Sequence, residues 1–249
     1  MRSNQHTGRR ALAGLATLAL ALAGATAVTT PAAADTAPAG GTPTTVSADP
    51  LPTVQQNGVV WAQVTVGDIV YATGSFTETW PGGQADKGTN ETARSDLLAY
   101  NITTGHLVRS FDHSLNAQGL GIAASPNGKT VYVVGDFTTV DGATHDHVVA
   151  FDTATGGIRK AFAAGVADEA DAVTATSSAV YIGGNFFAAG SATRTRLAAF
   201  APSDGSLLSW APTADDGQVS ALTMSPNGKR VIVGGRFTTL DGQAANGMG

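Results

Sequence analysis

Two groups of residues have the types and spacing for metal chemistry. Asp168, Glu169 and Asp171 stand close together, and His145 and His147 are separated by one residue. Carboxylates suit Ca²⁺ and imidazoles suit a transition metal, so one interpretation is a cation site with Ca²⁺ as the first candidate. The other interpretation is a solvated acidic rim, because the sequence has no Asp-x-Asp-x-Asp-Gly loop and two histidines alone are too few ligands.

Trp80 is the candidate for binding an organic ligand. It begins the stretch WPGG, inside a long insertion at 78–94. An indole ring can stack on a sugar ring, which would make extracellular carbohydrate the partner. The ring could equally hold the insertion against the fold, and an extracellular protein is the other partner considered.

The N-terminus has the three parts of a secretory signal peptide. Arg2, Arg9 and Arg10 precede an apolar run at 11–28, and three alanines at 32–34 offer a cleavage site. A retained membrane anchor is the alternative, but the run is short and rich in Ala and Gly. The expected segments are a signal peptide at 1–34, a flexible linker at 35–55 and a secreted, extracellular domain at 56–249.

Composition excludes several classes of protein. The net charge is −5, and loss of three arginines with the signal peptide would make it −8. Such a surface disfavours nucleic acid and anionic lipid, so we expect no nucleic-acid partner and no membrane attachment after cleavage. The sequence contains no cysteine, which excludes a disulfide scaffold.

The chain repeats itself with a period near 50 residues. Each repeat has a Gly-x-Phe after a β-rich run, then an aromatic before a Thr-Gly or Asp-Gly turn, then a third aromatic. These anchors are Phe76, Phe137, Phe186 and Phe237; Tyr100, Phe151 and Phe200; and Phe111, Phe162 and Trp210. A period of this length is typical of propeller blades, so we expect the first two sets to be buried in equivalent places.

Each repeat predicts four antiparallel strands. In the second copy they fall at 119–124, 129–137, 147–152 and 158–163, and the Asn-Gly pair at 127–128 predicts a type I′ hairpin turn. We therefore predict an all-β fold, a β-propeller of four-stranded antiparallel blades with about three and a half blades present. That count indicates a piece of a longer protein. A β-sandwich is the alternative, but it would not repeat its core at a fixed step.

The repeats resemble a known family. "VVGDFTTVDG" (133–142), "VVAFDTATGGIRKAF" (148–162) and "GTNETARSDLLAYNITTG" (88–105) are similar to the delta-repeat, kelch- or WD-like propellers that bacteria secrete. The resemblance implies the fold and export, and it implies little about activity. "AFAPSDGSLLSW" (199–210) also resembles the repeat of quinone-cofactor propellers, in which the motif mostly packs blades together.

The propeller topology predicts where the candidate residues lie. Loops that join second to third strands, and loops that enter the next blade, share one face of a propeller. His145 and His147 fall in a loop of the first kind, and the acidic group at 168–171 in one of the second kind. We therefore predict that all five candidate metal ligands line one rim.

Two classes of function remain. The sequence has no nucleophile elbow, phosphate loop or zinc-peptidase helix. The main hypothesis is therefore a non-catalytic extracellular module for binding or scaffolding. The alternative is a propeller enzyme, glycan-cleaving or quinoprotein-like, with its catalytic residues on the acidic face or in further blades.

Overall fold

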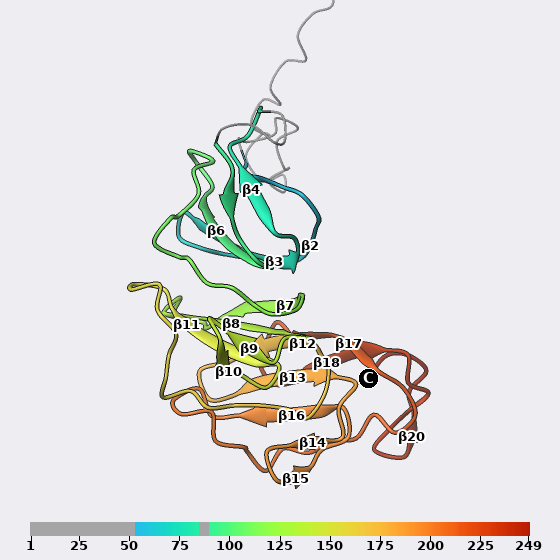
Figure 1. Cartoon of the computed structure of the whole chain (residues 1–249). Helices are drawn as coiled ribbons and strands as arrows, with labels where there is room; N and C mark the ends of the chain where they lie inside the picture. Colours follow the sequence, from blue (N-terminus) through green and yellow to red (C-terminus); the bar gives the residue numbers. More distant parts are fainter. Residues whose placement is uncertain (1–52, 85–89) are drawn as a thin grey trace, which may run out of the picture. The chain divides into compact units, whose positions relative to one another are not determined.

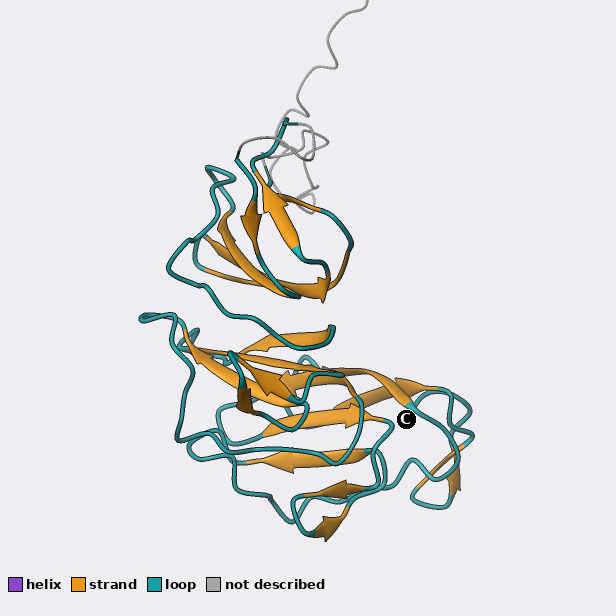
Figure 2. Cartoon of the chain, viewed as in Figure 1, coloured by secondary structure: helices purple, strands orange, loops and turns teal. Residues whose placement is uncertain are grey.

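The computed structural model describes residues 53–84 and 90–249, which form strands and loops (Figures 1 and 2). The expected signal peptide and nearly all of the expected linker lie outside these residues. Within the described ranges, no helix is long and apolar enough to cross a membrane.

Four antiparallel sheets follow one another along the chain, one for each sequence repeat, and we call them blades one to four (Figure 1). The first strands are β2 (Val59–Val66), β7 (Gly119–Ala124), β12 (Ala170–Ala175) and β17 (Val219–Met224). The second strands are β3 (Ile69–Ser75), β8 (Thr130–Gly135), β13 (Val180–Gly184) and β18 (Val231–Gly235). The third strands of blades one to three are β6 (Leu97–Asn101), β11 (Val148–Asp152) and β16 (Leu197–Phe200). The first strands of successive blades lie next to one another.

In blades one to three, the fourth strand is reduced to a single bridge. Instead of a strand at 158–163, Ile158 alone bridges Phe151. The equivalent bridges are Leu107 with Tyr100 and Leu207 with Phe200. The chain leaves the sheet after this bridge because the next aromatic, Phe162, turns back onto Tyr132, with ring centroids 5.3 Å apart.

The turn between β7 and β8 is not type I′, so that prediction was wrong. Type I′ needs positive φ at both Asn127 and Gly128, and only Gly128 has it, at 68°. Gly128 N–H donates to Ser125 O at 2.8 Å, and Asn127 Oδ1 accepts from Lys129 N–H at 3.0 Å. Proline before the asparagine favours this type I turn, in which glycine follows the turn's central pair.

Each connection from a second to a third strand contains a small hairpin, which the sequence did not reveal. The hairpins pair β4 (Glu78–Trp80) with β5 (Thr92–Ala93), β9 (Thr139–Val140) with β10 (Ala143–Thr144), β14 (Ala188–Ala189) with β15 (Ala192–Thr193), and β19 (Thr239–Leu240) with β20 (Gln243–Ala244). In blade one, β1 (Gln55–Gln56) pairs with β4, so a strand begins at the last residue assigned to the linker. The segments entering later blades bridge their hairpins at Leu115–Val140, Val166–Ala189 and Ala214–Leu240. The β4–β5 hairpin, which lies in the insertion, is therefore the longest of four equivalent hairpins.

A close approach of two backbone segments explains why the first position of Gly-x-Phe has to be glycine. The first strand has a bulge opposite this glycine in every blade, and a Cβ on Gly135 would overlap the carbonyl oxygen of Gln118. The equivalent glycines Gly74, Gly184 and Gly235 have the same restriction. His147 then closes the turn, since its N–H donates to Phe137 O at 3.0 Å and its carbonyl accepts from Gly135 N–H at 3.2 Å. Positive φ recurs at His147 and at its equivalents Asp96, Arg196 and Gly247.

The hydrophobic cores lie between neighbouring blades. Tyr71, Leu97 and Phe111 of blade one pack with residues of blade two, including Phe137 and Phe151. Similar cores join blades two and three and blades three and four. As predicted, Phe76, Phe137, Phe186 and Phe237 are each no more than 3% exposed, and Phe151 and Phe200 are buried too. Tyr100 is only half-buried, because in the described part of the chain no other blade packs against its face of blade one.

The third set of anchors pairs with tyrosines of the second strands. The pairs are Tyr71–Phe111 at 5.2 Å, Tyr132–Phe162 at 5.3 Å and Tyr181–Trp210 at 5.0 Å between ring centroids. Trp210 therefore has the packing role that the resemblance to quinone-cofactor propellers implied.

Adjacent phenylalanines in blade three provide a matched test of these cores. Phe186 is 0% exposed and Phe187 is 56% exposed. Phe186→Ala should lower the free energy of unfolding by about 3–5 kcal/mol, because a buried ring leaves a cavity. Phe187→Ala should cost less than about 1 kcal/mol, through its contact with the Arg196 guanidinium. Urea denaturation of both variants measures the difference, and equal losses would contradict this assignment of the core.

Candidate functional site

Most acids on the predicted face bind the protein's own groups. Asp112 Oδ1 pairs with the guanidinium of Arg94 at 2.7 Å. Asp216 Oδ1 accepts from Thr238 N–H at 2.7 Å, and the Thr238 hydroxyl is the main reason why the pKa of Asp216 is lowered. Loop N–H groups also donate to Asp141, Asp215 and Asp241. These carboxylates connect loops, so they are not free ligands.

Glu169 and Asp171 are neighbouring carboxyl groups at the start of β12 that affect each other's titration. Gln218 Nε2 donates to Asp171 Oδ2 at 2.9 Å. Burial, with the charges of Asp171 and Asp136, raises the pKa of Glu169 to about 7. Burial also raises the pKa of Asp171. The fold therefore favours the protonated form of Glu169 up to near-neutral pH.

The bulges of the first strands explain why polar side chains meet here. Asp171 is the bulged residue of blade three and contacts the residue before β17 in blade four. Trp61 is the bulged residue of blade one, and its Nε1 donates to Gln118 Oε1 of blade two at 2.9 Å. Gln118 Nε2 donates in turn to Asp136 Oδ2 at 2.7 Å. Gln118 and Asp136 were not among the predicted site residues. Asp136 is the middle residue of Gly-x-Phe, and Gln118 stands as far before its glycine as Gln218 does in blade four, which was a usable signal.

His145 and His147 occupy places that other blades fill with different residue types. The equivalents of His145 are Arg94 and Arg194, whose guanidinium groups donate to backbone carbonyls of the segment that follows the third strand. His147 is the residue with positive φ that closes the Gly-x-Phe turn, and its Nδ1 lies 3.0 Å from Gly135 O. Burial lowers the pKa of His145. Both histidines are therefore tied to positions of the repeat.

The five predicted metal ligands do not come together as one cluster. Among residues 53–84 and 90–249, no three His, Asp or Glu side chains are arranged to hold a metal ion. Asp168 is exposed, and its Oδ1 accepts from Glu169 N–H at 2.9 Å. The two histidines line a cavity that does not include the acidic group.

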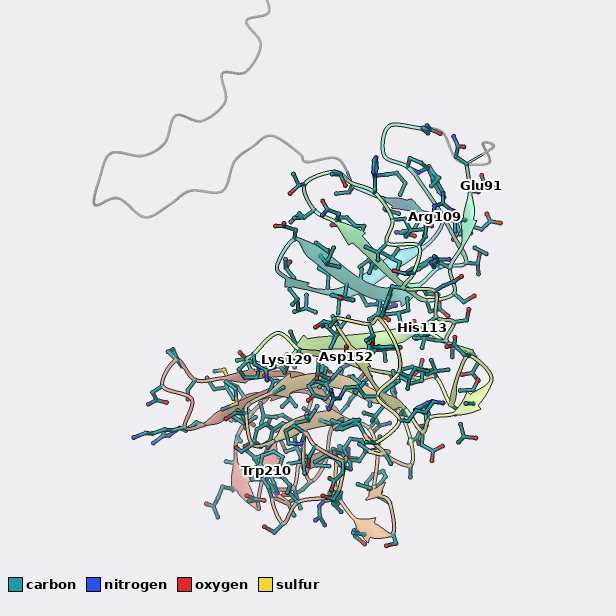
Figure 3. The ribbon with its side chains drawn as sticks, turned by 90° about the vertical axis from the view of Figure 1, so that its left-hand side faces the viewer. Glu91, Arg109, His113, Lys129, Asp152 and Trp210 are labelled. Atoms are coloured by element: carbon teal, nitrogen blue, oxygen red, sulfur yellow. The ribbon has the colours of Figure 1, made fainter. Side chains whose placement is uncertain are left out.

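Trp80 lines a pocket of about 340 Å³ between the β4–β5 hairpin and the outer edge of blade one. Its Nε1 donates to Gln84 O at 3.1 Å, which fixes the indole while one part of the side chain stays accessible. Asn90, His106 and Arg109 supply polar groups around it. Figure 3 labels Arg109 on this blade.

Two further cavities lie between blades two and three. The larger, about 940 Å³, is lined by His145, Asp146, His147 and Lys160 together with the segment at 162–167. The smaller, about 470 Å³, is on the side of the hairpin turns, where Arg159 lines it. The equivalents of Arg159 are Val108 and Leu208, so a charge replaces an apolar repeat residue there.

No protein-family model matches the sequence, and no curated protein matches it. Among solved structures, the WD40 repeats of RRP9 align with a TM-score of 0.50 and 10% identity, over 76% of this chain and 51% of theirs. The Cps50 (Swd1) β-propeller domain of Myceliophteria thermophila aligns with a TM-score of 0.47 and 9% identity, over 76% and 52%. The computationally designed Ika4 protein aligns with a TM-score of 0.47 and 17% identity, over 75% and 91%.

The fold is that of a β-propeller. The alignment with the RRP9 repeats and the blade-by-blade repetition agree on this point. The chain spans about half the length of the RRP9 and Cps50 chains that it matches.

Glu169→Gln should remove a pH-dependent loss of stability. The pKa of this carboxyl is 4.5 without the fold and about 7 within it. Between these values the folded chain holds a proton that the unfolded chain releases. The stability that comes from this group is therefore present below about pH 4.5 and is lost as the pH rises to about 7. The variant should have the same melting temperature as the parent at about pH 4.5 and a higher melting temperature than the parent at about pH 8.

Differential scanning calorimetry across this range measures the effect. Glu78→Gln, which changes an exposed glutamate of β4, is the matched control and should show no such trend. The parent must be measured alongside the variants because His145 also makes stability depend on pH. Burial lowers the pKa of this histidine, so its contribution to the free energy of unfolding increases as the pH rises towards 6.5. A Glu169→Gln difference that stays constant with pH would show that this carboxyl is not protonated in the folded chain.

Proposed function

We propose that this chain is an exported, non-catalytic binding module and that it holds carbohydrate against Trp80. The pocket at Trp80 is the observation that carries the proposal. Its volume, about 340 Å³, lies in the range of about 300–1,000 Å³ that is usual for small-molecule sites.

The chemistry of this pocket supports a sugar ligand. A sugar ring has an apolar face that an indole can cover and hydroxyl groups at its edge. Arg109 and Asn90 lie beside the indole, with donors for those hydroxyls and a carbonyl acceptor on the amide. Pro81 and Leu107 add apolar walls. Trp80, Pro81 and Asn90 of the insertion thus line a site that the shorter hairpins of the other blades lack the length to build.

The acids of the predicted face give little support to a glycan-cleaving reaction there. Glycosidases of the usual kinds need two available carboxyl groups about 5–9.5 Å apart, with the bond or a water between them. Asp112 is paired with Arg94, and Asp216 accepts from Thr238 N–H. A binding role is therefore preferred to the enzyme alternative.

Two sequence features support export. The segment 1–34 has the basic start, apolar run and small-residue end of a signal peptide. The repeats also resemble those of secreted delta-repeat propellers. An extracellular position would expose the Trp80 pocket to polysaccharides.

Trp80→Ala should weaken binding to cello- or chito-oligosaccharides by about tenfold, because an aromatic stacking contact contributes about 0.5–1.5 kcal/mol beyond its buried area. Trp61→Ala is the matched control, since Trp61 is 53% exposed and lies outside the pocket. Affinity electrophoresis and tryptophan fluorescence titration measure both variants. Equal affinity of Trp80→Ala and the parent for every sugar that the parent binds would refute the proposed site.

Export predicts a defined N-terminus. Material secreted from a high-GC Gram-positive host should begin at Asp35, after cleavage behind Ala34. N-terminal sequencing or intact-mass measurement of the culture medium tests this. Full-length chain retained in the membrane fraction would contradict it.

A further inference from the structure

The junction of blades one and two holds an ion pair and a histidine–aspartate hydrogen bond. Arg94 pairs with Asp112 at 2.7 Å. His113 Nδ1 lies 2.7 Å from Asp141 Oδ2, and its Nε2 lies 2.7 Å from Gly156 O of blade two. Figure 3 shows His113 where the chain passes between these blades. The space is closed by side chains from both blades.

The junction of blades two and three has the same backbone with smaller side chains. The bridges Leu115–Val140 and Val166–Ala189 set the register between the two junctions. In this register His145 replaces Arg94, Ala163 replaces Asp112, Ala164 replaces His113 and Gly190 replaces Asp141. Three of the four replacements remove nearly the whole side chain, and both carboxylates are lost.

The next junction lacks the first carboxylate and the histidine as well, but it keeps the other two side chains. Between blades three and four the four places hold Arg194, Ala211, Pro212 and Asp241. Asp241 Oδ1 accepts from Thr213 N–H at 2.7 Å, as Asp141 does from Ser114 at the first junction. The repeat therefore keeps the arginine and the second carboxylate there, and neither is kept between blades two and three.

The cavity of about 940 Å³ lies at these replaced positions, since Ala163, Ala164 and Gly190 line it. We call it the emptied socket. His145 and Lys160 also line it, and they offer nitrogen donors to a carboxylate like the one lost with Asp112. Ser191, next to Gly190 in the chain, and Ser206 add hydroxyl groups. Asp146 supplies the one carboxylate among the residues that line this cavity, and its side chain lies next to Gly165.

We propose that the emptied socket binds a sugar acid, with its carboxylate between Lys160 and His145 and its hydroxyls towards Ser191, Ser206 and Asp146. The carboxylate takes the place of the Asp112 side chain, and an ammonium group is the right partner for it. The hydroxyl part takes the place of the His113–Asp141 pair. Asp146 accepts hydrogen bonds from the sugar hydroxyls. This site is separate from the Trp80 pocket and does not depend on it.

The direct test refills the socket with the side chains of the first junction. Ala164→His combined with Gly190→Asp restores the pair that closes the space between blades one and two. Asp141 has a φ of 50° and Gly190 one of 54°, so the backbone at 190 suits an aspartate. Isothermal titration with glucuronate should detect binding by the parent and none by this variant.

Single-residue variants separate binding from folding. Lys160→Ala changes an exposed side chain and should lower the affinity for glucuronate about tenfold, through loss of a charged hydrogen bond. Lys229→Ala, an exposed lysine in the hairpin turn of blade four, is the matched control and should bind as the parent does. Trp80→Ala should also bind glucuronate as the parent does.

The probes have clear outcomes. Glucuronate should bind more tightly than glucose, which lacks the carboxylate, and more tightly than inorganic phosphate, which lacks the sugar. Equal binding of glucose and glucuronate would overturn the proposal. Parent-like binding by the refilled variant or by Lys160→Ala would overturn it as well.

Discussion

A peptide group of each first strand lies against a glycine of the neighbouring second strand, where a Cβ would not fit. This contact determines much of the blade. It puts a bulge in the first strand, and a bulge turns one side chain away from the sheet. In blade one that side chain is Trp61, and in blade three it is Asp171. The polar contacts between successive first strands therefore follow from a packing constraint of the backbone. Asp171, placed by its bulge, is also one of the charges that raise the pKa of Glu169.

The placement of the cores determines which parts of the blade can vary. Each core is built from the facing surfaces of two sheets, with Phe137 and Phe186 fully buried in their junctions. The polar contacts Arg94–Asp112 and His113–Asp141 come from the loops and stand outside these cores. Ala164 and Gly190 take the places of His113 and Asp141 in the next repeat, and the blade there keeps its fold. The loops can therefore change their side chains while the cores stay the same.

The sequence predicted those features that depend on the same residue type recurring at the same place in every repeat. The Gly-x-Phe glycines and the buried phenylalanines were recognised because their residue types do not change between repeats. The residue with positive φ was not recognised, because an aspartate, a histidine, an arginine and a glycine occupy it in turn. Its conformation is imposed by backbone hydrogen bonds to the Gly-x-Phe turn, which do not select a side chain. The turn at Asn127 was assigned the wrong type for a related reason, since Pro126 and the asparagine side chain outweighed the Asn-Gly pair.

Histidines and acids alone do not identify a site in this chain, because a repeat protein uses the same residue types to hold its loops. Alignment of the blades places His145 where Arg94 and Arg194 stand in other blades. The informative positions are those where one blade departs from its neighbours and the structure has a cavity at the same place. Ala163, Ala164 and Gly190 are small, neutral residues that no search for chemistry would select. They matter because the junction of blades one and two carries a carboxylate at two of these three places, and the sugar acid that we propose supplies one of them.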